Sequence, residues 1–209
     1  MRIYSASVDE LLCGHDVSFF YPVVSEYRQK QIDKFVFEKD RRLGICVELL
    51  LLRAMKEEGI ADEKYEITVG KFGKPELVSH PEFCFNLSHS EPMVMCVAAS
   101  VPIGCDIEKI TPFSPDLAKF CFTGNEYEKL MKKPAGFERN LYFCRLWTLK
   151  ESFMKATGLG MNLKPDSFEI EISADGQVSV HQNVSDAQFG FIEGNNTDGF
   201  CRSVCFEKK

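Results

Sequence analysis

The stretch Trp147-Thr148-Leu149-Lys150-Glu151-Ser152-Phe153-Met154-Lys155 sets two lysines and one carboxylate among bulky apolar residues. At helical spacing Trp147, Glu151 and Lys155 share one face, and Lys150 lies one step around the helix from Glu151. Taken alone, the pattern favours a partly buried helix with an ordinary Glu151–Lys155 ion pair, which is worth only about 0.2 to 0.5 kcal/mol. The same residue types also suit phosphate chemistry. Other parts of the chain are needed to choose between the two interpretations.

A second acidic cluster, Gly104-Cys105-Asp106-Ile107-Glu108, alternates small or apolar residues with acidic ones. This alternation is typical of a half-buried strand, and it places Asp106 and Glu108 on the same face. Neighbouring carboxylates repel each other unless a cation lies between them. Hard oxygen ligands suit magnesium, which commonly also takes substrate phosphate oxygens and water. The alternative is a solvated strand edge with two unrelated acids.

A third motif, Phe85-Asn86-Leu87-Ser88-His89-Ser90, follows Phe72-Gly73-Lys74-Pro75. Together with the two stretches above, in this order and spacing, these motifs resemble those of the 4′-phosphopantetheinyl transferases of the surfactin-synthetase-activating class. The resemblance covers most of the 209 residues and is weakest at both ends. It implies an α+β fold made of two similar halves, which are related by a pseudo-twofold axis and bind coenzyme A in the cleft between them.

The resemblance also implies an activity. The protein would transfer the 4′-phosphopantetheine group from coenzyme A to a serine of an acyl or peptidyl carrier protein and release adenosine 3′,5′-bisphosphate. Magnesium held by Asp106, Glu108 and Glu151 would bridge the pyrophosphate oxygens.

Four side chains are expected to take part in the chemistry itself. Lys150 and Lys155 would neutralise charge as the phosphorus–oxygen bond breaks. The carrier serine must also lose its proton, and Glu151 or Glu126 would accept it directly or through water. Of these two, Glu151 is preferred, although a magnesium ligand is a poorer base than a free carboxylate.

Binding residues for coenzyme A follow from the same resemblance. Lys74 and Pro75 match the motif that lies along the adenine, and Ser88 and His89 match the motif that contacts a coenzyme A phosphate. A histidine with an ordinary pKa near 6.5 readily becomes a cation beside a phosphate.

Two arginines, Arg28 and Arg42, lie where the family has further basic contacts. Gln31 departs from the pattern, because a second basic residue is expected there. Lys30 or Lys34 would substitute for it in holding the 3′-phosphate.

Composition excludes several classes of protein. The formal net charge of -6 argues against nonspecific nucleic-acid binding, which depends on clustered positive charge. The nine cysteines are scattered and form no C-x-x-C pair, as expected for reduced thiols. No charged-then-apolar leader follows Met1 and no run of 18 or more apolar residues occurs. We therefore expect a cytoplasmic protein without a membrane span, and the family resemblance implies a monomer.

The order of predicted elements indicates two halves. From Ser25 the chain is predicted to turn helical. An apolar series over 43–54 predicts an amphipathic helix that ends at Gly59, and a second helix over 140–157 ends at Gly158. Each is followed by strands at an offset of about 100 residues, which favours two α+β halves, 1–102 and 103–209. We place His89 in a loop over 88–92. The strands are predicted at 2–8, 65–69, 83–87, 93–98, 103–108, 168–172, 177–180, 187–192 and 199–206.

The segment 111–133 is richer in apolar residues than a connector requires, and its exposed part would dock a partner helix. Its apolar residues are Phe113, Leu117, Phe120 and Phe122, beside Lys119, Lys129, Lys132 and Lys133.

Two other functions use some of the same features. A metal-dependent phosphohydrolase acting on coenzyme A-like pyrophosphates would use the same carboxylates and lysines with water as nucleophile. A noncatalytic carrier-binding module would keep the docking surface without the metal site. The presence of Asp106, Glu108, Glu151 and Lys155 argues against that second alternative.

Overall fold

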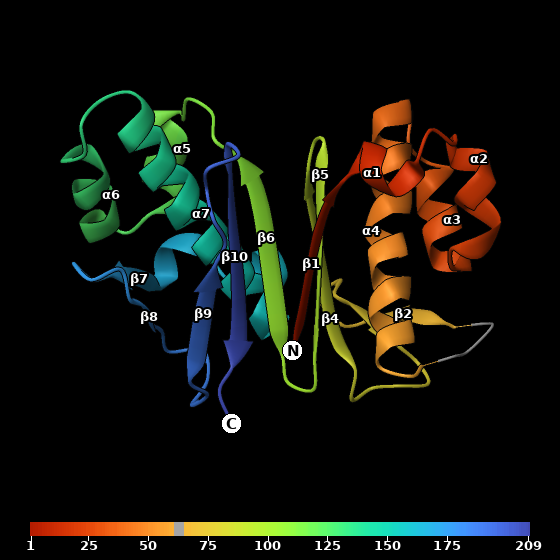
Figure 1. The fold of residues 1–209 in the computed structure, drawn as a ribbon. Coiled ribbons are helices and arrows are strands. Elements are labelled where there is room, and N and C mark those ends of the chain that lie inside the picture. Colours follow the sequence, from red (N-terminus) through yellow and green to blue (C-terminus); the bar gives the residue numbers. More distant parts are fainter. Residues whose placement is uncertain (61–64) are drawn as a thin grey trace. The chain divides into compact units, whose positions relative to one another are not determined.

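The computed structural model describes residues 1–60 and 65–209. The chain divides into two compact units, Met1–Val101 and Pro102–Lys209. Each unit combines a three-stranded antiparallel sheet with one long helix and several shorter elements (Figure 1). The predicted α+β class is therefore confirmed.

The sheet of the first unit has the strand order β1-β5-β4. Its strands are β1 (Arg2–Ser7), β5 (Met93–Ala99) and β4 (Cys84–Ser90), and the long helix α4 (Glu38–Glu57) packs against it. The shorter elements are α1 (Val8–Leu12), α2 (Val17–Phe20), η1 (Tyr21–Val23), α3 (Glu26–Ile32), β2 (Ile67–Val69) and β3 (Pro75–Leu77).

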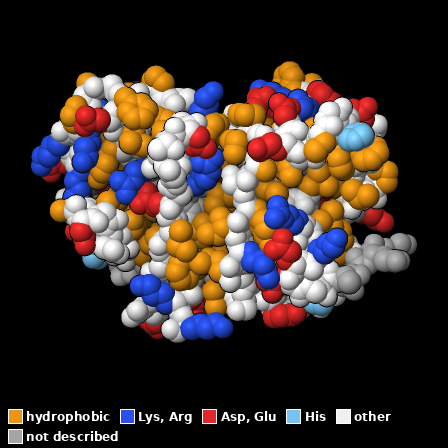
Figure 2. Space-filling model, in the orientation of Figure 1, with side chains coloured by type: hydrophobic (Ala, Val, Ile, Leu, Met, Phe, Trp, Pro, Cys, Tyr) orange, Lys and Arg blue, Asp and Glu red, His pale blue; other side chains and the backbone are white. Residues whose placement is uncertain are grey.

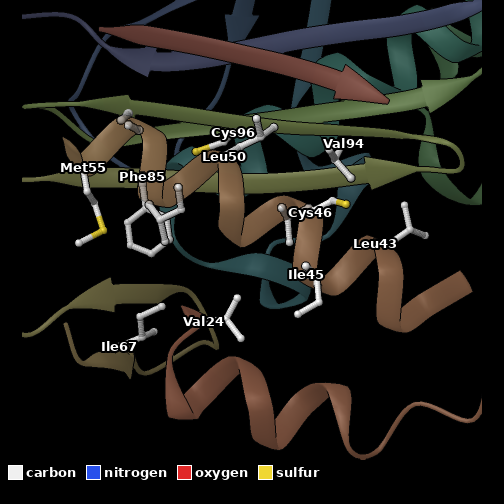
Figure 3. Close-up of a cluster of buried hydrophobic side chains, with 14 of the residues drawn as sticks. Val24, Leu43, Ile45, Cys46, Leu50, Met55, Ile67, Phe85, Val94 and Cys96 are labelled. Atoms are coloured by element: carbon white, nitrogen blue, oxygen red, sulfur yellow. The ribbon is translucent and has the colours of Figure 1, made fainter. Parts of the chain in front are cut away.

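The core of the first unit explains why α4 forms. The apolar residues that predicted this helix are all buried, so the helix is stabilised by one continuous face. Figure 3 shows Leu43, Leu50 and Met55 of α4 beside Phe85 and Val94 of the sheet strands. The helix begins at Glu38, five residues before the apolar series, because its first turn is polar and carries Glu38 and Asp40, which favour a helix N-terminus.

The sheet of the second unit has the strand order β6-β10-β9. Its strands are β6 (Ile103–Lys109), β10 (Phe200–Glu207) and β9 (Phe189–Glu193), and the long helix α7 (Phe137–Thr157) packs on β6 and β10. The shorter elements are α5 (Pro115–Cys121), α6 (Gly124–Met131), η2 (Gly160–Asn162), η3 (Pro165–Ser167), β7 (Glu169–Ile172) and β8 (Val178–His181).

Most predicted elements are confirmed, and α7 ends at Gly158 in the left-handed conformation, with φ 71°. One loop assignment is wrong. Strand β4 continues to Ser90 and pairs with β5 up to Met93, so His89 lies on a strand. The sequence could not predict this extension because Ser88, His89 and Ser90 show no alternation of apolar and polar residues. The strand is extended by its pairing with β5. Strand β3 was not predicted, because it is only three residues long and begins with a proline.

No helix in the described part of the chain is long and apolar enough to cross a lipid bilayer.

Candidate active site

Helix α7 packs on its sheet through small side chains. Cys144, Thr148, Ser152 and Ala156 recur at intervals of four residues, and all are buried. We call these four residues the small-residue stripe. Because they lie on one helix face, they allow the helix to approach the strands closely.

Gly104 on β6 is the point of closest approach. A Cβ atom at this position would lie 2.8 Å from the carbonyl carbon of Lys155, and closer still to Ser152 O and Ala156 N. Only glycine fits without moving the backbone. Asp106 lies two residues farther along β6, on the same face as Gly104, so this contact brings its carboxylate to α7.

Asp106 and Lys155 form an ion pair at this contact. Lys155 Nζ lies 2.6 Å from Asp106 Oδ1, and the Asp106 side chain is only 5% exposed whereas that of Lys155 is 26% exposed. Burial opposes the charge on Lys155, but the charge and hydrogen bond of Asp106, together with the charges of Cys105 and Glu151, outweigh it and raise the lysine pKa. The pair therefore favours the charged form of Lys155, whose side chain stays partly exposed.

Glu151 belongs to the same electrostatic group. It is half-buried and lies one turn before Lys155 on α7. Burial raises the pKa of Glu151, the charge of Lys155 partly offsets this effect, and the charge of Asp106 adds to it. Two carboxylates and one lysine thus influence one another at this site.

The oxygen donors suit a magnesium ion that substrate helps to bind. Within residues 1–60 and 65–209, no three His, Cys, Asp or Glu side chains form a ready-made metal site. Magnesium is usually held by one or two protein carboxylates and completed by substrate phosphates and water. Asp106 and Glu151 fit that requirement. Glu108 is half-buried and shares the Asp106 face of β6.

Lys150 does not join this group. Its side chain is 0% exposed, and Nζ lies 2.8 Å from Glu126 Oε1. Nζ also donates to the carbonyl oxygens of Pro165 and Phe168, each at 2.8 Å. Burial lowers the pKa of Lys150, and the charge of Glu126 partly offsets this. The ammonium group is thus committed to protein acceptors rather than directed to the point that Lys155 reaches.

Glu126 is equally committed. Its side chain is 1% exposed, and it accepts the backbone N–H groups of Thr123 at 2.8 Å and Ile170 at 2.7 Å. Together with Lys150 it ties the start of α6 to α7 and β7. Both residues therefore have a structural role here, which differs from the catalytic roles expected from the sequence.

The residues predicted to bind adenine and phosphate lie in the first unit. Lys74 is half-buried in a turn that is closed by the Gly70 N–H donating to Lys74 O at 2.8 Å. Pro75 begins β3. On β4, Ser88 is buried and His89 is exposed.

Arg28 and Arg42 have different surroundings. Arg28 is buried, and it donates from Nε to Glu48 at 2.9 Å and from Nη1 to Gln31 at 2.7 Å. Arg42 is 40% exposed and lies 2.7 Å from Asp9. Arg42 is thus the arginine that solvent can reach, whereas Arg28 holds a buried carboxylate.

The sequence interpretation missed Glu48, which is 0% exposed. It also accepts from the Ser25 N–H at 2.7 Å and the Tyr65 hydroxyl at 2.6 Å. The available signal was a single carboxylate at a core-facing position of the apolar helix over 43–54.

Comparison with known proteins identifies the family of both parts of the chain. Residues 102–205 match the family model of the 4′-phosphopantetheinyl transferase superfamily. Residues 13–101 match the model described as 4′-phosphopantetheinyl transferase, N-terminal. Among solved structures, the holo-[acyl-carrier-protein] synthase of Thermotoga maritima aligns with a TM-score of 0.45 and 18% identity, over 52% of this chain and 64% of that chain.

Two curated relatives match most of the chain. The 4′-phosphopantetheinyl transferase Sfp of Bacillus subtilis is 33% identical over 86% of this chain and 80% of its own length. The 4′-phosphopantetheinyl transferase psf-1 of Bacillus pumilus is 34% identical over 86% of this chain and 78% of its own length. Because these relatives match most of the chain at 33% identity or more, the chain belongs to the 4′-phosphopantetheinyl transferase superfamily.

Proposed function

We propose that the protein transfers the 4′-phosphopantetheine group of coenzyme A to a serine of an acyl or peptidyl carrier protein. Family membership supports the reaction class. The observation that carries the proposal is the partly exposed Lys155 ammonium, 2.6 Å from the buried Asp106 and one turn from Glu151. It combines a fixed positive charge with carboxylate oxygens, as transfer of a phosphorus group from a pyrophosphate to a hydroxyl requires.

Lys155 is the residue that contacts the transferred phosphate. Its raised pKa means that Lys155 is already protonated when an anion binds. A preorganised cation stabilises the charge that develops as the phosphorus–oxygen bond breaks. Lys150 and Glu126 are not part of the proposed catalytic group, because both are buried and bonded to each other.

Asp106 and Glu151, with Glu108 beside them, would hold the magnesium ion. When bound, the ion supplies a positive charge that neutralises pyrophosphate oxygens. The role of Asp106 and Glu151 is to orient those oxygens. Asp106, which is buried, also keeps water away from its own side of the site.

Glu151 is the residue that we assign to the proton of the carrier serine. Burial holds its pKa above the usual range of a glutamate, which brings it closer to the pH at which it must accept a proton. The serine Oγ–H would donate its proton to a Glu151 carboxylate oxygen as Oγ attacks phosphorus, while the pyrophosphate phosphorus–oxygen bond breaks and adenosine 3′,5′-bisphosphate leaves.

Coenzyme A recognition is assigned to residues of the first unit. Lys74 and Pro75 would lie along the adenine, and Ser88, His89 and Arg42 would contact phosphate. His89 and Arg42 are both accessible to solvent. His89→Ala should therefore weaken coenzyme A binding more than it lowers the maximal rate.

The carrier protein would dock on α5. Phe120 is 70% exposed and Leu117 is 44% exposed. Phe122 is buried and Phe113 stacks on Phe143, so these two phenylalanines belong to the core. Figure 2 shows Lys and Arg side chains gathered in the region where Figure 1 places α6. We define the α5 patch as Leu117, Phe120 and Lys119.

We also infer a reducing, cytoplasmic location, because none of the nine cysteines, all within the described residues, forms a disulfide.

Intact-mass analysis tests the proposed function. Candidate apo-carrier proteins are incubated with this protein, coenzyme A and magnesium, and one phosphopantetheine group should be added to the carrier. Asp106→Asn is the control, because it keeps the size of the side chain and removes its charge. Cleavage of coenzyme A without modification of any carrier would instead identify a phosphohydrolase.

A further inference from the structure

Ser203 is a buried polar residue that the proposed mechanism does not use. It lies on β10 and is 0% exposed. Its Oγ makes no hydrogen bond with any residue that the structure describes. Buried hydroxyl groups are nearly always bonded, so an exception of this kind needs a physical explanation.

The position of Ser203 supplies one. In the antiparallel pairing of β6 and β10, Ser203 lies directly opposite Asp106. Side chains of such a pair share one face of the sheet, with Cβ atoms about 4.5 to 5.5 Å apart. A serine side chain rotates among three staggered positions, so its hydroxyl can reach the neighbouring carboxylate.

We propose that Ser203 is a positioning residue that donates its hydroxyl proton to the Asp106 carboxylate when Lys155 contacts the substrate phosphate. This inference rests on the proposed transferase function. In the structure, Lys155 Nζ lies 2.6 Å from Asp106 Oδ1. The same ammonium group is proposed to contact the substrate phosphate. A buried carboxylate that shares its cation with substrate gains from a second donor, and an ionised carboxylate accepts several.

A purely structural explanation is also available. Cys201 and Cys205 flank Ser203 on the same face and lie opposite Glu108 and Gly104, so a small residue is needed where α7 packs closely. Alanine is at least as small as serine. Ser203→Ala therefore keeps the packing and removes only the donor, which separates the two explanations.

The experiment compares Ser203→Ala and Ser203→Cys with the wild type. Cysteine fills the space of serine but is a weaker donor. The matched control is Ser152→Ala, because Ser152 is also buried at this interface but its hydroxyl donates to Leu149 O of its own helix at 2.9 Å. The measurements are thermal midpoint, kcat and KM for coenzyme A and carrier, and the rise in thermal midpoint caused by coenzyme A with magnesium.

Ser203→Ala should be as stable as the wild type or more stable, because an unbonded buried hydroxyl is removed. Its kcat should fall about ten-fold or more, the scale of a hydrogen bond to a charged group. Both KM values should stay within about two-fold, and coenzyme A with magnesium should stabilise the variant less than the wild type. The kcat of Ser203→Cys should lie between the values of Ser203→Ala and the wild type. Ser152→Ala should keep the wild-type rate.

Wild-type kcat in Ser203→Ala would overturn the inference and leave the transferase function intact. A fall in rate that only matches a fall in thermal midpoint would support the structural explanation instead. Failure of the wild type to modify any carrier would overturn the proposed function itself, and this inference with it.

Discussion

Gly104 lies against the backbone of Ser152, with no room between them for a methyl group. This contact sets the distance between β6 and α7. It therefore determines where Asp106 and Lys155 meet.

Gly104→Ala should destabilise the protein by about 3 kcal/mol, at the upper end of the range for overpacked interiors, because backbone atoms rather than a flexible side chain must move. Transfer activity should fall as well, since α7 carries Glu151 and Lys155. Urea unfolding with a transfer assay measures both effects. Gly124→Ala is the matched control, because a Cβ there meets nothing within 4 Å. Equal stability of the Gly104 and Gly124 variants would contradict the close-packing explanation.

Lys150→Ala should cost about 3 to 5 kcal/mol, because it leaves the Glu126 carboxylate buried without its cation. Lys132→Ala is the control. Lys132 pairs with Glu128 at 2.7 Å, but their side chains are 70% and 65% exposed, so its removal should change stability little. Chemical denaturation of both variants provides the comparison. Similar losses for the two would show that Lys150 is not the buried support described here.

The nine residues from Trp147 to Lys155 show how far sequence reasoning reaches. Their spacing correctly predicted a helix, with Trp147, Glu151 and Lys155 along one half-buried edge. The spacing did not predict that Lys150 is buried among protein acceptors whereas Lys155 stays partly exposed. The acceptors that bind Lys150 come from residues 126, 165 and 168, which are brought to it only by tertiary folding.

The acidic strand shows the same limit. Alternation predicted β6 and placed Asp106 on the face away from Ile103, Cys105 and Ile107. That face was assigned to metal binding, and the structure shows that it also packs against α7. The small residues that permit this packing lie on separate elements, four residues apart on α7 and two apart on β10. Helical and strand periodicity each describe one element, so neither reveals a contact between two.

Glu151→Gln should stabilise the protein at pH 7 while abolishing transfer. The pKa of Glu151 is raised in the folded state, chiefly by burial, so folding favours its protonated form. That contribution is present below the unfolded pKa of about 4.3 and is lost as pH rises through the folded pKa. The difference in thermal midpoint between variant and wild type should therefore grow from pH 4 to pH 7.

Glu138→Gln is the control for that series, because Glu138 is exposed in the first turn of the same helix. It should bring no gain in stability at any pH. A Glu151→Gln protein less stable than the wild type at pH 7 would mean that the ionised carboxylate is favoured by its surroundings.

Phe120→Ser should raise the KM for carrier protein while the KM for coenzyme A stays unchanged. Phe120 is 70% exposed on α5, so its removal should leave the core intact. Lys119 beside an apolar side chain offers both contact area and charge complementarity to an acidic carrier protein. Lys119→Glu should act in the same direction. Added salt should weaken carrier use by the wild type more than by the Lys119 variant, because screening acts on an attraction that only the wild type has.

Phe37→Ser provides the control for this surface. Phe37 is 62% exposed and precedes α4 in the first unit, outside the α5 patch. Its loss removes a comparable apolar area and should leave carrier kinetics unchanged. Steady-state assays on one carrier at several salt concentrations compare all three variants. If Phe120→Ser and Phe37→Ser have the same carrier KM, the carrier docks on a surface other than α5, and Phe120 is only a solvent-exposed residue of a core helix.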